Sequence, residues 1–394
     1  MSDYSDIIIV GAGPVGLLFA RQFKNTPLRV TVIEKHKKNI LQNPPFDGRE
    51  IALTHFSQHF LKRSGIWDLI PSDSIYPLKE AQVMNGNSEY CLFFAQPKQA
   101  RGKKIDRLGF LVSNCNIRKA CYEAASQLEN VTIISEASVE GLSISTQCAQ
   151  VKLSDGRTLQ TSLLVAADGR FSHIRQMAGI PVDIHQFGRT VICFRMSHEK
   201  SNEHRACEMF HYGRTLAVLP LTSHLSSMVI TIDSDLAEQI VDLTPEETAE
   251  DIYNELKGRL GIMQLRGKKV VYPLSGVHAR RFYDKRLALI GDAAVGMHPV
   301  TAHGFNLGIE SVAHLSQLVL HANNKGQDIA SETLLQRYDI KHQVKTRLLY
   351  HATNFLVKLY TAENIPAKAL RILLLRFSNH FPPIKNLITK QLTG

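Results

Sequence analysis

Glycines and carboxylates stand directly after three apolar stretches of the chain, where they could hold a dinucleotide. The stretches read D-I-I-I-V-G-A-G-P-V-G (6–16), L-L-V-A-A-D-G (163–169) and L-A-L-I-G-D-A-A (287–294). In the first stretch, the spacing of Gly11, Gly13 and Gly16 provides a tight turn, a close backbone approach to a pyrophosphate and a close helix–strand contact. Glu34 follows 18 residues after Gly16, where a carboxylate can accept hydrogen bonds from ribose hydroxyl groups.

The second and third stretches each end on an acidic residue beside a glycine. Asp168-Gly169 closes the second stretch. In the third stretch, at Gly291-Asp292, the carboxylate of Asp292 can accept a hydrogen bond from a hydroxyl group of the ribityl chain of FAD. The loop after Asp292 leads into a helix from Phe305 onward, whose first backbone N–H groups suit the negatively charged edge of a reduced isoalloxazine ring. Three such turns in this order predict a discontinuous FAD-binding domain.

The elements that must position these turns can be read from apolar periodicity. Residues 7–10 are expected to form a buried parallel strand, followed by a helix from Gly16 to about Phe23 and a second strand over 29–33. A loop is expected over 35–48, because this segment is basic and contains Pro, Asn and Gly.

Arg49 follows this loop. Ile51, Phe56 and Phe60 recur at helical spacing, which predicts a helix that begins near Arg49. At that position Arg49 would face a pyrophosphate, where a planar cation binds two oxygens at once, and a solvated arginine is the alternative. Another helix is expected over 113–128, with Arg118 in its first turns.

The block from about 180 to 275 has a different sequence pattern. Its alternating segments at 191–196, 216–221 and 227–232 are typical of an antiparallel sheet, and a polar helix is expected from Pro245 to Leu260. We therefore predict an α/β fold (α+β overall), with a Rossmann-like FAD-binding domain, an inserted, mostly antiparallel β-sheet substrate domain and a helical C-terminus. The expected boundaries are 1–75, 101–180 and 276–344 for the FAD-binding domain, 76–100 and 181–275 for the substrate domain, and 345–394 for a basic helical region.

Composition limits the class of protein. At 394 residues, with 44% hydrophobic and 21% charged residues, the chain fits a globular enzyme rather than a disordered or fibrous protein. No apolar run approaches the roughly 20 residues that span a bilayer, and the acidic, polar start argues against a secretory signal. Six cysteines form no C-x-x-C pair and no metal-ligand spacing, so reduced thiols and no metal site are expected.

Positive charge is concentrated at the C-terminus. From residue 345 onward, eight Lys and Arg stand against one acid, Glu363, so this tail carries +7 of the chain's +10. No nucleic-acid motif accompanies the charge, and the tail is rich in Leu, Ile and Phe, so an anionic membrane surface is favoured over nucleic acid as the partner. A cytoplasmic protein bound to the inner face of the cell membrane is expected, and a C-terminal helix pair packed on the FAD-binding domain is the alternative.

Taken together, the motifs resemble those of class A flavin monooxygenases, and among these the ubiquinone-biosynthesis hydroxylases related to 2-octaprenyl-phenol hydroxylase. The resemblance covers nearly the whole chain, with motifs in family order: G-A-G-P-V-G-L, D-G-R-E-I-A-L, Asp168-Gly169, M-F-H-Y-G-R-T-L-A-V-L-P-L (209–221), Y-P-L (272–274) and G-D-A-A-x-x-x-H-P-x-x-x-x-G-F-N-L-G. With the motifs above, it implies an FAD-binding set of Gly11, Gly13, Pro14, Val15, Gly16, Glu34, Lys35, Arg49, Arg118, Val139, Asp168, Gly169, Gly291, Asp292, Pro299, Gly304, Phe305 and Asn306.

Within this set, the resemblance places Pro299, Gly304 and Asn306 along the isoalloxazine ring. The chain departs from the family pattern at three places. Val295 stands where a histidine is usual, Ala302-His303-Gly304 stands where G-Q-G is usual, and Met228 stands where a tryptophan is common.

The resemblance also implies a reaction. NADPH or NADH would reduce FAD, O₂ would add at flavin C4a, and the hydroperoxide would deliver one oxygen to the ring of a polyprenyl phenol or quinol of ubiquinone biosynthesis. His303 is the predicted catalytic residue, as a proton-handling or substrate-orienting group, with a helix-capping role as the alternative. A flavin reductase of prenyl chains and a non-catalytic FAD-binding scaffold for other quinone-biosynthesis proteins remain alternative functions.

Overall fold

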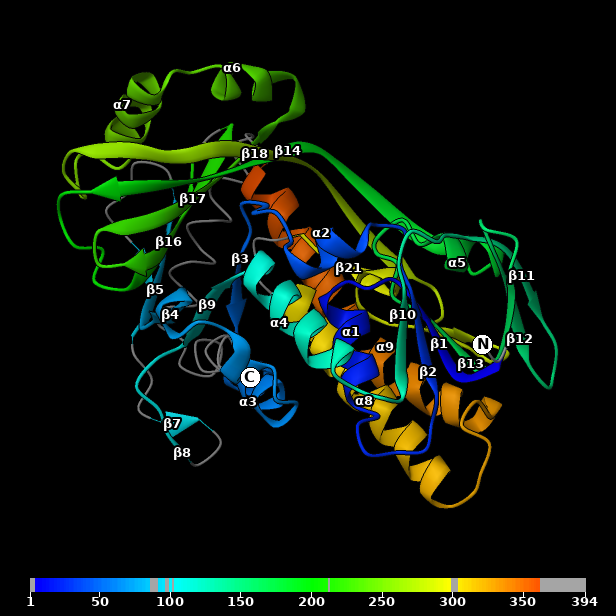
Figure 1. Cartoon of the computed structure of the whole chain (residues 1–394). Coiled ribbons are helices and arrows are strands. Elements are labelled where there is room, and N and C mark those ends of the chain that lie inside the picture. The colour runs from blue at the N-terminus through cyan, green and yellow to red at the C-terminus, as the bar shows by residue number, and fades with distance from the viewer. Residues whose placement is uncertain are drawn as a thin grey trace.

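Two large β-sheets and the helices packed against them make up the molecule (Figure 1). The computed structural model describes residues 4–85, 91–95, 99–100, 103–211, 213–298 and 304–361. The predicted basic tail beyond residue 361 therefore lies outside the described residues, as do Pro299 and His303.

The first sheet is built on the apolar strands that precede the glycine turns. Its strands are β1 (Tyr4–Val10), β2 (Val30–Ile33), β10 (Val131–Ile134), β11 (Val139–Ile144), β12 (Ala149–Leu153), β13 (Thr158–Ala166), β19 (Tyr283–Asp284) and β20 (Leu287–Leu289). Strands β10, β2, β1, β13 and β20 pair in parallel in that order, and β12 and β11 extend the sheet in antiparallel fashion. The carboxyl ends of β1, β2, β13 and β20 thus share one edge, which brings the three predicted turns together.

The second sheet is mostly antiparallel. It has the order β21-β18-β14-β17-β16-β15-β5-β6, and its only parallel pair among the described strands is β15 with β5. The strands are β5 (Glu80–Asn85), β6 (Cys91–Phe94), β14 (Val182–His198), β15 (Arg205–Phe210), β16 (Arg214–Thr222), β17 (Leu225–Asp233), β18 (Met263–Ala279) and β21 (Val295–Gly296).

Strands β14 and β18 connect the two sheets. They pair from Val182 opposite Ala279 to His198 opposite Met263 and form a long twisted ribbon that runs from the first sheet to the second (Figure 1). Strand β18 passes without a break through the predicted boundary at 275/276. The division into domains stays a prediction.

Two smaller sheets accompany the large ones. Strands β3 (Glu50–Leu53), β9 (Gly109–Ser113) and β4 (Ile75–Leu78) form an antiparallel sheet, and β4 and β9 contact β16 of the second sheet. Strands β7 (Gln99–Ala100) and β8 (Lys103–Lys104) form a short pair. The second sheet therefore has one face turned toward β3, β9 and β4, which we call the inward face.

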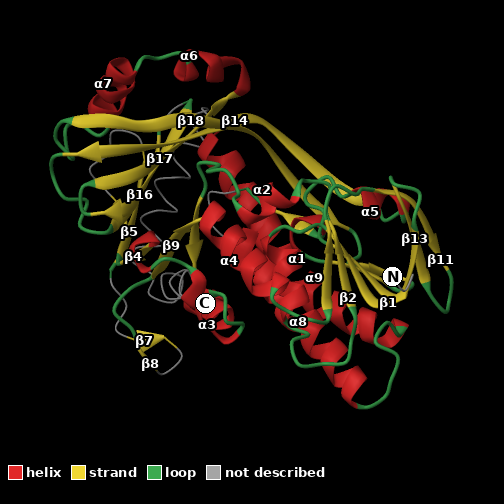
Figure 2. Ribbon diagram, in the orientation of Figure 1, coloured by secondary structure: helices red, strands yellow, loops and turns green. Residues whose placement is uncertain are grey.

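The described helices cover both sheets. They are α1 (Pro14–Arg21), α2 (Lys38–Gln42), α3 (His55–Arg63), α4 (Asn114–Ser126), α5 (His173–Met177), α6 (Ala237–Val241), α7 (Pro245–Glu255), α8 (Gly304–Asn324) and α9 (Glu332–Thr361). Helix α1 packs against α4 and α8, and α8 packs against α9, while α6 and α7 lie over the second sheet (Figure 2). Within this described part of the chain, no helix combines the length and apolar character that crossing a membrane requires.

The predicted fold class is confirmed, with two local errors. The segment 35–48 was expected to be a loop, but it contains the short helix α2 (Lys38–Gln42). Ile51 was expected in a helix beginning near Arg49, but it lies in β3 and pairs with Val112 of β9. Helix α3 begins later, at His55, because Thr54 caps it by accepting a hydrogen bond from the backbone N–H of Ser57 (3.2 Å).

Candidate functional site

Three glycines close the turn after β1, and each has different surroundings. Gly11 has φ +107°, and a Cβ there would lie 2.4 Å from the carbonyl oxygen of Ala167. A Cβ on Gly16 would lie 2.1 Å from the carbonyl oxygen of Gly11, whereas a Cβ on Gly13 would meet nothing within 4 Å. The turn is therefore closely packed on both sides of Gly13 and leaves open space beside it, where a pyrophosphate could approach the backbone.

The start of α1 is suited to an anion. Pro14 stands in its first turn and no side chain caps the helix at Gly13, so the first N–H groups stay available to a ligand. Val15 fills the space beside two other glycines: Cβ atoms on Gly291 and Gly308 would lie 3.0 and 2.8 Å from its methyl groups. The third turn and α8 thus lie directly against the first turn of α1.

Glu34 is fixed at the end of β2, where it is 8% exposed. Its Oε2 accepts a hydrogen bond from the backbone N–H of Ala12 (2.8 Å), and its Oε1 accepts one from the backbone N–H of His36 (3.0 Å). The carboxylate is thereby held beside the glycine turn, as a ribose-binding acid needs to be.

Lys35, Arg118 and Val139 complete the predicted ADP-binding set. Lys35 is exposed directly after Glu34, and Val139 is buried at the start of β11. The segment before β11 lies beside the end of β2, because the backbone N–H of Ala137 donates a hydrogen bond to the carbonyl oxygen of Glu34 (3.0 Å). Arg118 is half-buried on α4, the helix that packs against α1. Contact of these three residues with FAD stays a prediction.

Two arginines that sequence reasoning missed join the second and third turns. Arg175 of α5 is 1% exposed and donates hydrogen bonds to the carbonyl oxygens of Ala293 (2.8 Å) and Arg170 (3.1 Å). Arg170 forms an ion pair with Asp292 (Nη2–Oδ2 3.4 Å). The available signal was Arg170, immediately after Asp168-Gly169, with Arg175 five residues further along the chain.

Asp168 and Gly169 have separate roles in the second turn. Oδ2 of Asp168 accepts a hydrogen bond from the backbone N–H of Ile174 (3.1 Å), which anchors the start of α5. Burial raises the pKa of Asp168, although hydrogen bonds from α5 oppose the shift. Gly169 has φ +89°, and a Cβ there would meet nothing within 4 Å, so open space lies beside the turn.

Arg49 lies between the third turn and the second sheet. It forms an ion pair with Asp47 (Nη2–Oδ2 2.5 Å), and its guanidinium carbon lies 5.5 Å from the ring centroid of Tyr272 on β18. Asp47 is also held by Nδ2 of Asn114 on α4 (2.6 Å). Burial disfavours the charged form of Arg49, but the hydrogen bond and charge of Asp47 outweigh it and raise the pKa of Arg49, with a smaller contribution from the charge of Asp292. Contact of Arg49 and Asp292 with FAD stays a prediction.

Asn306 fastens the start of α8 to β3 and α3. Its Nδ2 donates to the carbonyl oxygen of Ala52 (2.8 Å), and its Oδ1 accepts from the backbone N–H of Thr54 (3.1 Å) and from the hydroxyl of Ser57 (2.6 Å). A Cβ on Gly304 would meet nothing within 4 Å. Phe305, between them, is half-buried against the main core.

The family departures fall in different places. Val295 is 2% exposed in β21, opposite His278 of β18, and so belongs to the core. Met228 is fully buried in the cluster between the second sheet and α7, away from the inward face. His303 lies outside the described residues, and its catalytic role stays a prediction.

The inward face lies against the segment that carries Arg49. Pairing across β15, β16, β17 and β14 puts Glu208, Ala217, Val229 and Cys193 in one row. A Cβ on Gly48 would lie 3.0 Å from the Cβ of Cys193, so this row faces the 47–53 segment. Residues from the flavin side and from the second sheet therefore meet here.

Three charged residues of this region were missed by sequence reasoning. Glu50 forms a hydrogen-bonded ion pair with Arg195 of β14, and burial raises the pKa of Glu208 to about 8, which favours the neutral form of its carboxyl group. No local sequence pattern indicates a role for any of these three residues, because the alternation of apolar and polar residues does not show which face of a strand meets a ligand.

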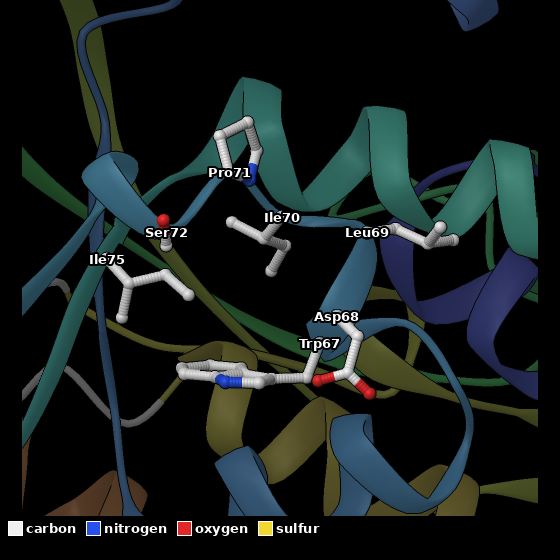
Figure 3. Close-up of a pocket in the computed structure, with 7 residues that line it drawn as sticks. All are labelled: Trp67, Asp68, Leu69, Ile70, Pro71, Ser72 and Ile75. Atoms are coloured by element: carbon white, nitrogen blue, oxygen red, sulfur yellow. The ribbon is translucent and has the colours of Figure 1, made fainter.

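The segment that connects α3 to β4 lines a separate pocket (Figure 3). It is lined by Trp67, Asp68, Leu69, Ile70, Pro71, Ser72 and Ile75. Its one charged side chain, Asp68, is exposed, and none of the predicted FAD-binding residues lines it. We therefore place the candidate site at the shared edge of the first sheet.

The open space beside Gly13, the uncapped start of α1 and the fixed carboxylate of Glu34 fit an FAD molecule. Residues 4–351 match the protein family described as FAD binding domain. Ubiquinone hydroxylase UbiM of Neisseria meningitidis is 54% identical over 394 residues, which cover 100% of this chain and 86% of the relative. Ubiquinone hydroxylase UbiL of Rhodospirillum rubrum is 32% identical over 392 residues, covering 99% and 90%.

Among solved structures, p-nitrophenol 4-monooxygenase PnpA of Pseudomonas putida shares the fold. Its TM-score is 0.78 at 19% identity, with 99% of this chain and 98% of that chain covered. At this low identity, the structural likeness supports only the fold. The class of enzyme is supported by the family match and the relatives. The chain belongs to the FAD-binding monooxygenase family that contains the ubiquinone hydroxylases.

Proposed function

We propose that this chain hydroxylates the aromatic ring of a polyprenyl phenol or quinol in ubiquinone biosynthesis, with NADH or NADPH as electron donor. The overall reaction consumes the substrate, O₂, NAD(P)H and a proton, and yields the hydroxylated ring, NAD(P)⁺ and water. The names of UbiM and UbiL support the pathway. The observation that carries the proposal is the 47–54 segment, which contacts the second sheet at Gly48 and Asn306 of α8 at Ala52.

In this proposal bound FAD would activate O₂, one atom of which enters the ring while the other leaves as water. The glycine turn and Glu34 hold the ADP half, Arg49 and Asp292 hold the middle, and Asn306 fixes the loop beside the ring system. The small sheet and the inward face then enclose the substrate and keep bulk water away from the reacting atoms. His303 stays a candidate for proton handling.

The experiment that tests the proposal uses the full-length chain loaded with FAD. We expect phenol-dependent oxidation of NADH or NADPH and a product that has gained one oxygen atom from O₂. A strain lacking the gene should accumulate a ring-unhydroxylated quinone precursor. A precursor with an unreduced prenyl chain would favour a reductase, and FAD binding without any NAD(P)H oxidation would favour a scaffold.

We also propose that the outer face of α9 contacts an anionic membrane surface, from which a polyprenyl substrate would enter. Four large apolar residues of α9 recur on one face and are 65%, 72%, 73% and 55% exposed: Ile340, Val344, Leu348 and Phe355. Exposed Arg337, Lys341 and Arg347 accompany them. Apolar side chains flanked by cations match a surface of anionic headgroups over acyl chains.

Substitution on α9 tests this contact. Leu348→Glu removes an apolar anchor and adds a negative charge, so we expect at least about a tenfold loss of binding to phosphatidylglycerol vesicles, which corresponds to about 1.4 kcal/mol. Ile262→Glu is the matched control, because Ile262 is 72% exposed on the loop before β18. Equal vesicle binding by the wild type and the Leu348 variant would contradict the proposal, and loss of a dimer in gel filtration would assign the face to a second copy instead.

A further inference from the structure

Glu50 is a carboxylate enclosed between two sheets. Its side chain is fully buried, and it lies on β3, on the face that meets Arg195 of β14. The guanidinium of Arg195 donates to Oε1 of Glu50 through Nε (3.0 Å) and Nη2 (2.5 Å), and it stacks on the ring of Phe46 at 4.4 Å. One oxygen of Glu50 is therefore fully occupied by the arginine.

The other oxygen of Glu50 has no such neighbour. Oε2 is buried and has no hydrogen-bond partner among the described residues. Burial raises the pKa of Glu50, and Arg195 opposes this shift by stabilising the carboxylate. A buried carboxylate oxygen without a donor costs free energy, so a ligand that brings a donor to it gains affinity.

Ser227 provides a second polar atom of the same kind. It pairs directly with Arg195 across β14 and β17, so both side chains lie on the inward face. Ser227 is 1% exposed, and its Oγ has no hydrogen-bond partner among the described residues. Glu50, which binds the guanidinium of Arg195, and Ser227, which pairs with Arg195 across the sheet, thus each carry one unpartnered oxygen.

The position of this cluster relates it to the flavin. Ala52 follows Glu50 by two residues on the same strand face, and its carbonyl oxygen is bound by Asn306 of α8, a residue predicted to line the isoalloxazine ring. Tyr76 of β4 is close enough for the charges of Glu50 and Arg195 to act on its pKa. The cluster therefore joins the inward face to β3, the strand that binds the start of α8.

We propose that Glu50, Arg195 and Ser227 form a subsite for the ring hydroxyl group of the substrate, with Oε2 of Glu50 accepting a hydrogen bond from that hydroxyl. This inference rests on the proposed phenol hydroxylase function and adds the residues that recognise a free phenol. A ligand without the O–H would leave the carboxylate oxygen buried and unpaired. A binding site built around a buried polar group rejects ligands that lack the matching hydrogen-bonding group. This discrimination is far stronger than that of an apolar pocket between ligands of similar shape.

The test compares 2-allylphenol with its methyl ether, 2-allylanisole, as ligands of the FAD-loaded enzyme. Binding is followed by the change in flavin absorbance, so no turnover is needed. We expect the wild type to bind the phenol at least about 100-fold more tightly than the ether. Glu50→Gln retains the shape and can still bond Arg195, but it can present an N–H donor where Oε2 stood, so the ratio should fall to within about threefold.

Controls keep the outcomes separate. Glu80→Gln is the matched control, because Glu80 pairs with Arg205 on the same sheet (2.8 Å) outside the cluster, and its ratio should equal the wild-type value. If Glu50→Gln fails to load FAD, Ser227→Ala takes its place, with an expected loss of about threefold to tenfold in phenol affinity.

If an FAD-loaded Glu50→Gln variant keeps the wild-type ratio of phenol to ether affinity, the subsite is overturned. Where Ser227→Ala replaces that variant, unchanged phenol affinity overturns the subsite in the same way. Either result leaves the hydroxylase proposal standing. A wild type that binds FAD but neither ligand overturns both.

Discussion

The nucleotide-binding edge of the first sheet and the inward face of the second sheet hold their polar side chains by different means. At the edge, buried side chains bond to the backbone, as Glu34 does to Ala12 and Arg175 does to Ala293. On the inward face, Glu50 meets the side chain of Arg195, and Glu208 is desolvated with no charged partner among the described residues to offset its raised pKa.

This difference has consequences for mutation. A site fixed by backbone groups depends on turn shape, so one added methyl group can distort it while most surface changes are tolerated. A site made of buried charged side chains keeps its shape on isosteric substitution, but its protonation and specificity change. Substitutions in the two regions should therefore give different signatures.

The largest effect is expected from Gly11→Ala. A Cβ at this position would lie 2.4 Å from the Ala167 carbonyl oxygen, at φ +107°, so β1 and the second turn would have to separate. We expect a loss of more than about 3 kcal/mol in the free energy of unfolding, read as a large fall in Tm.

Gly156→Ala is the control for Gly11→Ala. Gly156 also has positive φ (+88°), but a Cβ there would meet nothing within 4 Å, so only the backbone strain of about 1 kcal/mol should appear. Equal losses at Gly11 and Gly156 would show that the close approach of the two turns contributes nothing.

Gly13→Val should separate binding from folding. Because a Cβ on Gly13 meets nothing within 4 Å, we expect the Tm of the FAD-free chain to change little. The side chain would fill the space left for the pyrophosphate, so FAD affinity should fall by at least about 100-fold, or about 2.7 kcal/mol. Fluorescence titration with FAD measures this loss, Gly13→Ala should be intermediate, and unchanged affinity would move the pyrophosphate away from this turn.

The same contrast explains what could be predicted from sequence. The spacing of the glycines and of Glu34 is local, so it predicted the turns and the fold of the first sheet. The contact between Glu50 and Arg195 joins residues 145 positions apart, and nothing near either residue signals the other. Ile51 was misplaced for a related reason, since short apolar runs suit both helix and strand and its partner Val112 lies far along the chain.

The smallest effect, and the sharpest test of the inward face, is expected from Glu208→Gln. Burial raises the pKa of Glu208 to about 8, whereas a glutamate in the unfolded chain has a pKa of about 4.3. Between these values the folded chain keeps a proton that the unfolded chain has lost, so this group lowers the free energy of unfolding as pH rises. Partial access of solvent to Glu208 keeps this loss small.

Glutamine at position 208 has no such titration. The gain in Tm of the variant over the wild type should therefore be small at pH 5 and reach a few degrees above pH 8. Glu140→Gln, at an exposed position on β11 of the first sheet, should show no pH-dependent gain. A gain in Tm of equal size at both pH values would mean that Glu208→Gln acts through packing rather than through desolvation of the carboxylate. In that case Glu208 would give no evidence that the two regions differ in their electrostatics.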